Sequence, residues 1–393
     1  MTSPPTADAP VPAALRVLDR PGLDALLAAL RQSGHTLIGP TVRDGAIVYD
    51  EIATTSDLPE GWTEEQHGGS YRLIRRVDGA LFGYTVGPHS WKQFLLPAHV
   101  PVWRAARDGD GFRFEPAAPA PPRYAFLGVR SCDLAAIHIQ DRVLLGGTHT
   151  DPVYRARREG AFVVVVRCSL AGNNCFCASM GAAPWREQGF DLALAELLSP
   201  GRHEFLVEAG SPAGERMLEG LPLRPAEPGE LEAARVQARA VVAGMRKSLR
   251  TEGLKELLYT RYEHPRWEQV AARCLACGNC TQVCPTCFCT TVEEVTALTG
   301  AHTERHRLWD SCFSLEYSYI HGGSVRHSVR SRYRQWLTHK LGTWDDQFGT
   351  PGCVGCGRCI TWCPVGIDIT EEAQALQAGD RSAAPAGSDG ARR

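Results

Sequence analysis

The chain has 393 residues and a formal net charge of −2 at pH 7, so it is long enough for two or three domains and lacks the global basic charge that favours nucleic acid. Its strongest apolar run, residues 161–166, is far too short to span a bilayer, and residues 1–12 lack the basic start and apolar stretch of a signal peptide. Fifteen cysteines in a chain without an export signal favour metal ligation over disulfides, and we expect a cytoplasmic location.

The N-terminal part of the chain begins with one predicted helix and two predicted hairpins. Asp19 can cap a helix over residues 20–32, because Pro21 suits the first turn and leucines then recur at helical spacing. Two turn signals, Asp44-Gly45 and Asp78-Gly79, each separate a pair of β-like runs. The predicted hairpins pair residues 36–41 with 46–52, and residues 71–77 with 81–86.

A strand–helix–strand pattern follows a Pro/Ala-rich stretch at residues 117–122, which we interpret as a linker. This order of elements is typical of an α/β unit. Further along, residues 231–258 are rich in Ala, Arg, Leu and Glu and predict a long helix, with Gly244 and Gly253 as its candidate breaks. The strand, helix and strand of the α/β unit are predicted at residues 124–129, 132–145 and 162–166.

Two cysteine runs of identical spacing lie in the C-terminal part of the chain. Each reads Cys-x2-Cys-x2-Cys-x3-Cys-Pro, which is the ligand pattern of a bacterial two-cluster ferredoxin. In that pattern, three cysteines of a run bind one [4Fe–4S] cluster and the fourth crosses to the other cluster. The sequence therefore predicts two clusters, one bound by Cys274, Cys277, Cys280 and Cys363, and the other by Cys353, Cys356, Cys359 and Cys284.

The spacing of these runs favours iron–sulfur clusters over zinc. Zinc ribbons use pairs of Cys-x2-Cys rather than a triple followed by a fourth cysteine and a proline. Gly278 and Gly357 follow the second cysteine of each run, where the missing Cβ lets backbone N–H groups approach cluster sulfurs. Small ferredoxins carry their two runs much closer together, so the insertion at residues 285–352 predicts added docking or shielding surface.

These segments predict a chain of mixed class, α+β or α/β, in five parts. In order, they are a disordered leader (1–15), an N-terminal mixed α/β domain (16–225), a helical bridge (226–262), a two-cluster ferredoxin-like domain (263–372) that contains the insertion (285–352), and a disordered tail (373–393).

Four further cysteines lie in the predicted N-terminal domain, at strand ends or in the loops that follow. Such positions are where α/β sheets build sites. The four could hold a third [4Fe–4S] cluster, and the alternatives are a structural zinc site or buried thiols that act as small apolar groups. We favour the third cluster, with the ligands Cys132, Cys168, Cys175 and Cys177.

Three cysteines remain, Cys287, Cys289 and Cys312. They could ligate a further cluster with one outside residue, but we favour buried thiols that line the cluster environment. Residues 317–344 contain no acidic residue but several basic ones, including Lys340. This stretch is either a solvated helix face or a basic flank beside anionic thiolate-ligated clusters or a partner subunit.

Motifs for a catalytic centre are not found in the sequence. There is no Walker A loop, no GxGxxG after a predicted strand and no legible Ser/His/Asp arrangement. We therefore assign no catalytic residue and expect neither a flavin nor a nicotinamide site on this chain.

The combination of the two runs with the upstream cysteines resembles a known family. The chain resembles the iron–sulfur beta subunit of cytoplasmic NAD(P)-linked [NiFe] hydrogenases of the sulfhydrogenase type, and the related A subunit of anaerobic sulfite reductase. The likeness covers roughly residues 124–370 and leaves out the extended termini. It rests on residues 128–134, Tyr154 with Arg157-Arg158, and residues 168–177, 274–280, 284–287, 309–312 and 353–359.

The resemblance implies an electron-transfer subunit. Its clusters would relay electrons between a flavin subunit that handles NAD(P)H and the small and large catalytic subunits of a [NiFe] hydrogenase, or alternatively the sirohaem subunit of a sulfite reductase. It also favours the third cluster, because the four upstream cysteines lie in the shared segments. The alternative of another class is a zinc-stabilised structural or regulatory protein.

Overall fold

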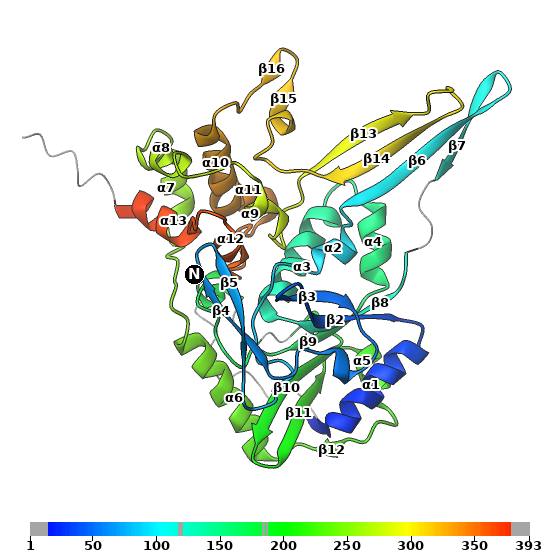
Figure 1. The fold of residues 1–393 in the computed structure, drawn as a ribbon, viewed down its shortest axis with the longest axis vertical. Coiled ribbons are helices and arrows are strands. Elements are labelled where there is room, and N and C mark those ends of the chain that lie inside the picture. The colour runs from blue at the N-terminus through cyan, green and yellow to red at the C-terminus, as the bar shows by residue number, and fades with distance from the viewer. Residues whose placement is uncertain (1–14, 117–120, 183–184, 186–187, 379–393) are drawn as a thin grey trace, which may run out of the picture.

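The computed structural model of the protein describes residues 15–116, 121–182, 185 and 188–378. Residues 1–14 of the predicted leader, residues 117–120 of the predicted linker and the predicted tail beyond residue 378 lie outside these ranges. Figure 1 shows the large N-terminal sheet at one end of the long axis and the cysteine-rich helical part toward the other. The predicted mixed α/β class is confirmed.

An eight-stranded mixed sheet forms the N-terminal part. Its strands are β1 (Arg16–Asp19), β2 (Thr36–Arg43), β3 (Ala46–Glu51), β8 (Tyr124–Val129), β9 (Phe162–Val166), β10 (Leu192–Ser199), β11 (Arg202–Ala209) and β12 (Arg224–Pro225). Their order is β12-β1-β11-β10-β9-β8-β2-β3, and the neighbours from β10 to β2 run parallel. β9 reads FVVVV and is buried throughout, which is typical of a parallel strand covered on both faces.

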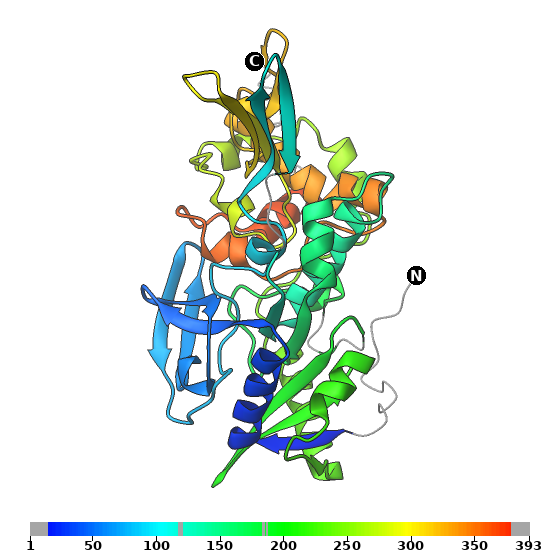
Figure 2. The same cartoon turned by 90° about the vertical axis from the view of Figure 1, so that its right-hand side faces the viewer.

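Helices cover both faces of this sheet. One face carries α1 (Arg20–Gln32) and α5 (Pro212–Leu218), and the other carries α3 (Ser131–Leu144), α4 (Pro152–Glu159) and α6 (Pro228–Ala243). The helix predicted at residues 20–32 is confirmed. Asp19 caps it by accepting a hydrogen bond from the Gly22 N–H at 2.8 Å, and its leucines face the sheet. In Figure 2, α1 lies in dark blue along the sheet.

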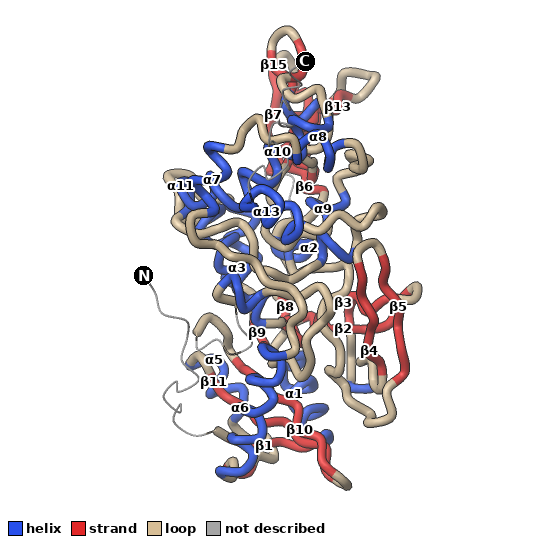
Figure 3. The backbone as a smooth tube through the Cα atoms, turned by 90° about the vertical axis from the view of Figure 1, so that its left-hand side faces the viewer, coloured by secondary structure: helices blue, strands red, loops and turns tan. Residues whose placement is uncertain are grey.

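The first predicted hairpin is confirmed, because β2 and β3 pair antiparallel around Asp44-Gly45. The second is wrong, since β5 (Ser70–Arg75) pairs with β4 (Trp62–His67), as Figure 3 shows, and residues 81–86 form no strand. Buried side chains take the place of a strand partner there. The Glu196 carboxylate accepts from the Leu81 N–H at 2.6 Å, and Arg130 donates to the Phe82 carbonyl at 2.9 Å.

The predicted strand–helix–strand unit is confirmed as β8, α3 and β9, with the two strands parallel. The long helix predicted at residues 231–258 is instead two helices, because α6 ends before Gly244 and α7 (Leu254–Thr260) begins after Gly253, whose φ is +67°. α6 packs against β10 and β11, whereas α7 packs against the C-terminal helices. The two halves of the predicted bridge thus belong to different cores.

A second sheet joins the two parts of the chain and extends away from the body in Figure 1. Its strands are β6 (His99–Asp108), β7 (Gly111–Pro116), β13 (Thr290–Thr296) and β14 (His302–Trp309), in the order β13-β14-β6-β7. β14 belongs to the insertion and pairs antiparallel with β6 of the N-terminal part. The insertion therefore adds surface and also links the two cysteine-containing regions.

The C-terminal part is helical and has its own core around Trp267, Tyr333 and Trp336. The prediction of a disordered tail is wrong over residues 373–378, because α13 continues to Ala378 and buries Ala373 and Leu376. Its helices are α8 (Arg266–Ala271), α9 (Asn279–Gln282), α10 (Val329–Thr338), the π-helix η4 (His339–Thr343), α11 (Trp344–Phe348), α12 (Arg358–Thr361) and α13 (Ile369–Ala378).

The remaining elements are short. They are η1 (Thr55–Asp57), α2 (Lys92–Leu95), η2 (Cys177–Met180), η3 (Glu316–Ser318), β15 (Tyr319–Ile320) and β16 (Gly323–Ser324). In the part of the chain that the structure describes, none of the helices has the length and apolar character needed to cross a membrane.

Candidate metal centres

The two cysteine runs adopt the same local backbone. In each run, a loop over the first two cysteines leads into a short helix, α9 or α12. The residue two places after the first cysteine has a positive φ, +52° at Ala276 and +68° at Gly355, and its N–H lies 3.4 Å from the Sγ of that cysteine. Gly278 and Gly357 are also left-handed. Such loops turn N–H groups toward an anionic centre.

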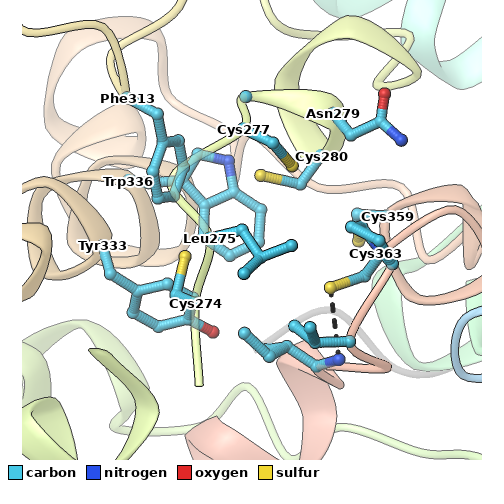
Figure 4. A pocket seen from close by; sticks show the side chains of 14 residues that line it. Cys274, Leu275, Cys277, Asn279, Cys280, Phe313, Tyr333, Trp336, Cys359 and Cys363 are labelled. Carbon is cyan, nitrogen blue, oxygen red and sulfur yellow. Dashed lines mark hydrogen bonds between the residues drawn. The ribbon is translucent and has the colours of Figure 1, made fainter. Parts of the chain in front are cut away.

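The predicted ligands of the first cluster line one pocket (Figure 4). Cys274, Cys277 and Cys280 reach it from the first run and Cys363 from the end of the second. Cys359, a predicted ligand of the second cluster, also lines this pocket. The Ile367 N–H donates a hydrogen bond to the Cys363 Sγ at 3.3 Å. Cys277 is exposed, so this pocket lies at the protein surface. The aromatic residues that line the pocket are Phe313, Tyr333 and Trp336.

The predicted ligands of the second cluster also meet, but in the interior. Burial, together with the nearby thiols of Cys356 and Cys284, raises the pKa of Cys353 to about 12. Burial likewise raises the pKa of Cys359, and the thiols of Cys353, Cys356 and Cys284 raise it further. Cys284, Cys353 and Cys356 are each at most 9% exposed.

Both sets of donors suit a [4Fe–4S] cube. A cube binds one thiolate at each of four irons, so its ligands are spread more widely than the four ligands of one zinc ion. Within the described ranges, no three or more Cys, His, Asp or Glu side chains form a group that could hold a single metal ion. Each thiolate would bind one iron, and the cluster would supply one-electron redox chemistry.

The four upstream cysteines come together beside the second run. Cys132 lies in the first turn of α3, Cys168 follows β9, and the other two lie in the next loop. Burial and the nearby thiols of Cys175 and Cys168 raise the pKa of Cys177. The pKa of Cys132 is also raised, by burial first and then by Asp133 and the thiols of Cys356 and Cys177.

Two fully buried arginines border this group of four cysteines. Arg358 forms a two-pronged ion pair with Asp133, with N–O distances of 2.8 and 3.1 Å. Arg130 also lies close to Cys168 and holds down the pKa of that thiol, which burial raises. Arg130 donates hydrogen bonds to the carbonyls of Phe82, Tyr84, Val166 and Arg167, and the buried Glu64 carboxyl also lies near it.

The loop that carries Cys175 and Cys177 packs directly on the second run. A Cβ placed on Gly355 would lie 2.6 Å from the backbone of Phe176, and one on Gly357 would lie 2.4 Å from the carbonyl oxygen of Asn174. The Phe176 N–H donates to the Gly355 carbonyl at 2.8 Å. Glycine is required at these two positions because of close approach to the N-terminal domain as well as positive φ.

Of the other three cysteines, Cys287 and Cys289 lie near Lys340, whereas Cys312 lies near Cys289 and near Cys280, a ligand of the first set. Cys287 lies beside Cys284, and a hydrogen bond from Cys312 lowers the pKa of Cys289 to about 6. Two buried lysines contact this region. The Lys340 Nζ lies 3.3 Å from the Cys284 Sγ, and the Lys92 Nζ lies within 3.4 Å of the carbonyls of Thr281 and Gln282.

The sequence carries no signal for Lys92, and Lys340 stands out in it only as a member of the basic stretch at residues 317–344. The members of that stretch differ in environment. Arg330 and Arg334 form ion pairs with Glu263, whereas Lys340 is only 2% exposed and contacts sulfur. A side chain that reaches a distant ligand across an insertion leaves no periodic pattern in the sequence.

Comparison with known proteins identifies the family. A family model described as a 4Fe-4S dicluster domain matches residues 273–367. The sulfhydrogenase 2 subunit beta of Pyrococcus furiosus is 32% identical over 320 residues, and the match covers 77% of this chain and 88% of that relative. The chain belongs to the sulfhydrogenase beta-subunit family. Comparison with solved structures gives no significant match.

Membership of this family confirms the resemblance predicted from the sequence, and the matched domain confirms the two-cluster ferredoxin class of the C-terminal part. A dicluster domain implies two [4Fe–4S] clusters and a role in electron transfer. The name of the relative describes one subunit of a hydrogenase.

Proposed function

We propose that this chain relays electrons between a flavin subunit that handles NAD(P)H and the small and large subunits of a [NiFe] hydrogenase. The proposal rests on the arrangement of twelve cysteines in three groups of four. Two groups lie in the matched dicluster domain, and the third packs against the second cysteine run. The relative's name supports a hydrogenase as the partner. The chain itself holds and tunes the clusters, and the partners perform the chemistry at hydrogen and NAD(P).

The proposed ligands follow the crossed ferredoxin pattern. The surface pocket would hold one cluster through Cys274, Cys277, Cys280 and Cys363. The buried set would hold the other through Cys353, Cys356, Cys359 and Cys284. In this arrangement Cys284 and Cys363 tie the two centres into one unit.

We assign a third [4Fe–4S] cluster to Cys132, Cys168, Cys175 and Cys177. The buried charge of Arg130 supports this assignment over neutral thiols. A buried cation costs several kcal/mol unless nearby anions and dipoles offset that cost. The buried Glu64 carboxyl and the Tyr84 ring lie near Arg130 and offset part of it. Thiolates on Cys168 and its neighbours would add further negative charge. The N-terminus of α3 also favours a thiolate at Cys132, because its free N–H groups carry partial positive charge.

The relay is tested by separating hydrogen chemistry from electron delivery. In the isolated hydrogenase complex, Cys280→Ala should remove the cluster at the surface pocket. Hydrogen–deuterium exchange at the catalytic subunits needs no relay and should continue, whereas H2-dependent reduction of NAD(P)+ should fall to background. Asn279→Ala is the matched control, because Asn279 is the exposed neighbour of Cys280 and its side chain donates to the Trp362 carbonyl at 2.8 Å. Unchanged NAD(P)+ reduction in a complex that has lost the cluster contradicts the proposal.

The third cluster is tested by its own electron paramagnetic resonance signal. Cys132→Ser should remove one reduced-state signal and leave the pair from the dicluster domain. Cys312→Ser removes a thiol outside the three groups and should leave all signals in place. Persistence of every signal in Cys132→Ser rules out the N-terminal ligand set.

A further inference from the structure

Lys340 is a buried cation that the insertion brings to a predicted cluster ligand. Its side chain is only 2% exposed. Its Nζ lies 3.3 Å from the Cys284 Sγ and 3.4 Å from the Cys287 Sγ, and donates to the Gly352 carbonyl at 3.0 Å and the Thr286 hydroxyl at 3.3 Å. Cys284 is the cysteine that crosses from the first run to the second set of ligands.

The surroundings of Lys340 contain sulfur but no contacting carboxylate. Among the described residues, none of the ion pairs formed by acidic side chains involves Lys340. An ammonium group buried among neutral oxygens alone would cost several kcal/mol. The two sulfurs are therefore the groups that can carry its countercharge, and Cys284 bears that charge when it is a ligand.

The backbone holds Lys340 in place from both sides. Lys340 lies in η4, a single π-helical turn between α10 and α11, and such turns often occur at functional sites. Its carbonyl accepts a hydrogen bond from the Gly352 N–H at 2.8 Å, while its Nζ donates to the Gly352 carbonyl. Gly352 directly precedes Cys353. Lys340 therefore contacts one predicted ligand of the buried set, Cys284, and the residue next to another.

The surface pocket has no equivalent cation at its crossing cysteine. Cys363 accepts a hydrogen bond from the Ile367 backbone N–H, and no lysine or arginine among the described residues donates to its sulfur. The two sets of ligands thus share their spacing and their loop backbone, but among the described residues only the crossing cysteine of the buried set, Cys284, has a lysine Nζ at its sulfur. A second buried lysine, Lys92, also lies near Cys284 but donates to backbone carbonyls.

We propose that Lys340 is a positioning residue that raises the reduction potential of the cluster bound through Cys284. This inference rests on the proposed electron relay. Reduction adds one electron to a cluster and makes it more negative, so a fixed cation at a ligand sulfur stabilises the reduced form. The buried cluster, which lies between the surface pocket and the third group of cysteines, would therefore accept an electron more readily than it would without Lys340.

Three substitutions separate charge from hydrogen bonding at this position. Lys340→Met removes both, Lys340→Gln keeps a hydrogen-bond donor without the charge, and Lys340→Arg keeps the charge. Lys255→Met is the control, because Lys255 is a partly exposed lysine on α7 that pairs with Asp346. Each variant is purified without oxygen in the hydrogenase complex, and the midpoint potentials are measured by redox titration followed by electron paramagnetic resonance.

In Lys340→Met and Lys340→Gln, the midpoint potential of one cluster of the dicluster domain should fall. The midpoint potential of the other cluster should stay unchanged. The Arg and Lys255→Met variants should keep both potentials near those of the unmodified protein. Unchanged potentials in a neutral variant that retains both clusters overturn the proposal. Loss of the cluster in both neutral variants also overturns it, because Lys340 would then be an anchor for assembly. Absence of both clusters from the unmodified protein would instead refute the proposed relay.

Discussion

The two cysteine runs have the same spacing and the same local backbone, yet they lie in opposite environments. The first run is open to solvent, with Cys277 exposed and Leu275 63% exposed. The second is buried, and the N-terminal loop that carries Cys175 packs on its glycines. The comparison teaches that a repeated ligand motif can serve two positions in one relay, one toward a partner and one toward the next centre within the chain.

The difference arises at equivalent residues of the two runs. Arg358 and Asn279 each precede the third cysteine, but Arg358 reaches the buried Asp133 of α3, whereas Asn279 stays at the surface. Gly355 and Ala276 are likewise equivalent, and only Gly355 faces another segment too close for a Cβ. Packing against the N-terminal domain therefore restricts which residues the second run can carry, and the first run does not have this restriction.

The largest expected effect is from breaking the buried ion pair. Arg358→Met should destabilise the protein by about 3–5 kcal/mol, because it leaves the Asp133 carboxylate buried without its partner. Asn279→Ala at the equivalent position should cost no more than about 1.5 kcal/mol, since it removes one exposed hydrogen bond. Chemical denaturation of the anaerobic protein measures both. Equal losses would remove the proposed difference between the two runs.

A smaller effect is expected from exchanging the residues at the positive φ positions. Gly355→Ala should destabilise by about 1–3 kcal/mol and disturb the third cluster, because its Cβ would meet the Phe176 backbone. Ala276→Gly should be neutral or stabilise by up to about 1 kcal/mol, since glycine adopts its φ of +52° without strain. The free energies of unfolding of both variants, together with the electron paramagnetic resonance signal of the third cluster, check this prediction. An unchanged free energy of unfolding in Gly355→Ala would contradict tight packing of the N-terminal loop on the second run.

The smallest expected effect concerns the order of iron loss. A chelator that enters from solvent should remove the cluster at the exposed Cys277 before the one at Cys356, which is only 8% exposed. Two decay phases in the resonance signals during chelation would reveal the order. Simultaneous loss of both signals, or earlier loss at the buried set, contradicts the difference in exposure.

Much of the local structure could be predicted from the sequence because its causes are local. Asp19 caps α1 and spaced leucines bury one face of it, while spacing alone grouped Cys274, Cys277 and Cys280. The wrongly predicted second hairpin shows the limit. The segment after Gly79 looks β-like, but Glu196 and Arg130 satisfy its backbone from far along the chain. Contacts of this kind have no period that a sequence can display.

The same limit explains what was missed at the candidate centres. Lys340 reaches Cys284 across the insertion, and β14 of that insertion pairs with β6 of the N-terminal part. Both contacts depend on how distant segments pack. The basic stretch at residues 317–344 did suggest positive charge near thiolates, but only the structure separates the buried Lys340 from the half-buried Arg330.

The most direct test of the electron-relay account is a count of iron and acid-labile sulfide in the anaerobically purified chain. Three [4Fe–4S] clusters predict about 12 iron and about 12 sulfide per chain. About 8 iron per chain would agree with two clusters in the dicluster domain and would contradict the third cluster. Zinc without iron would contradict the relay itself.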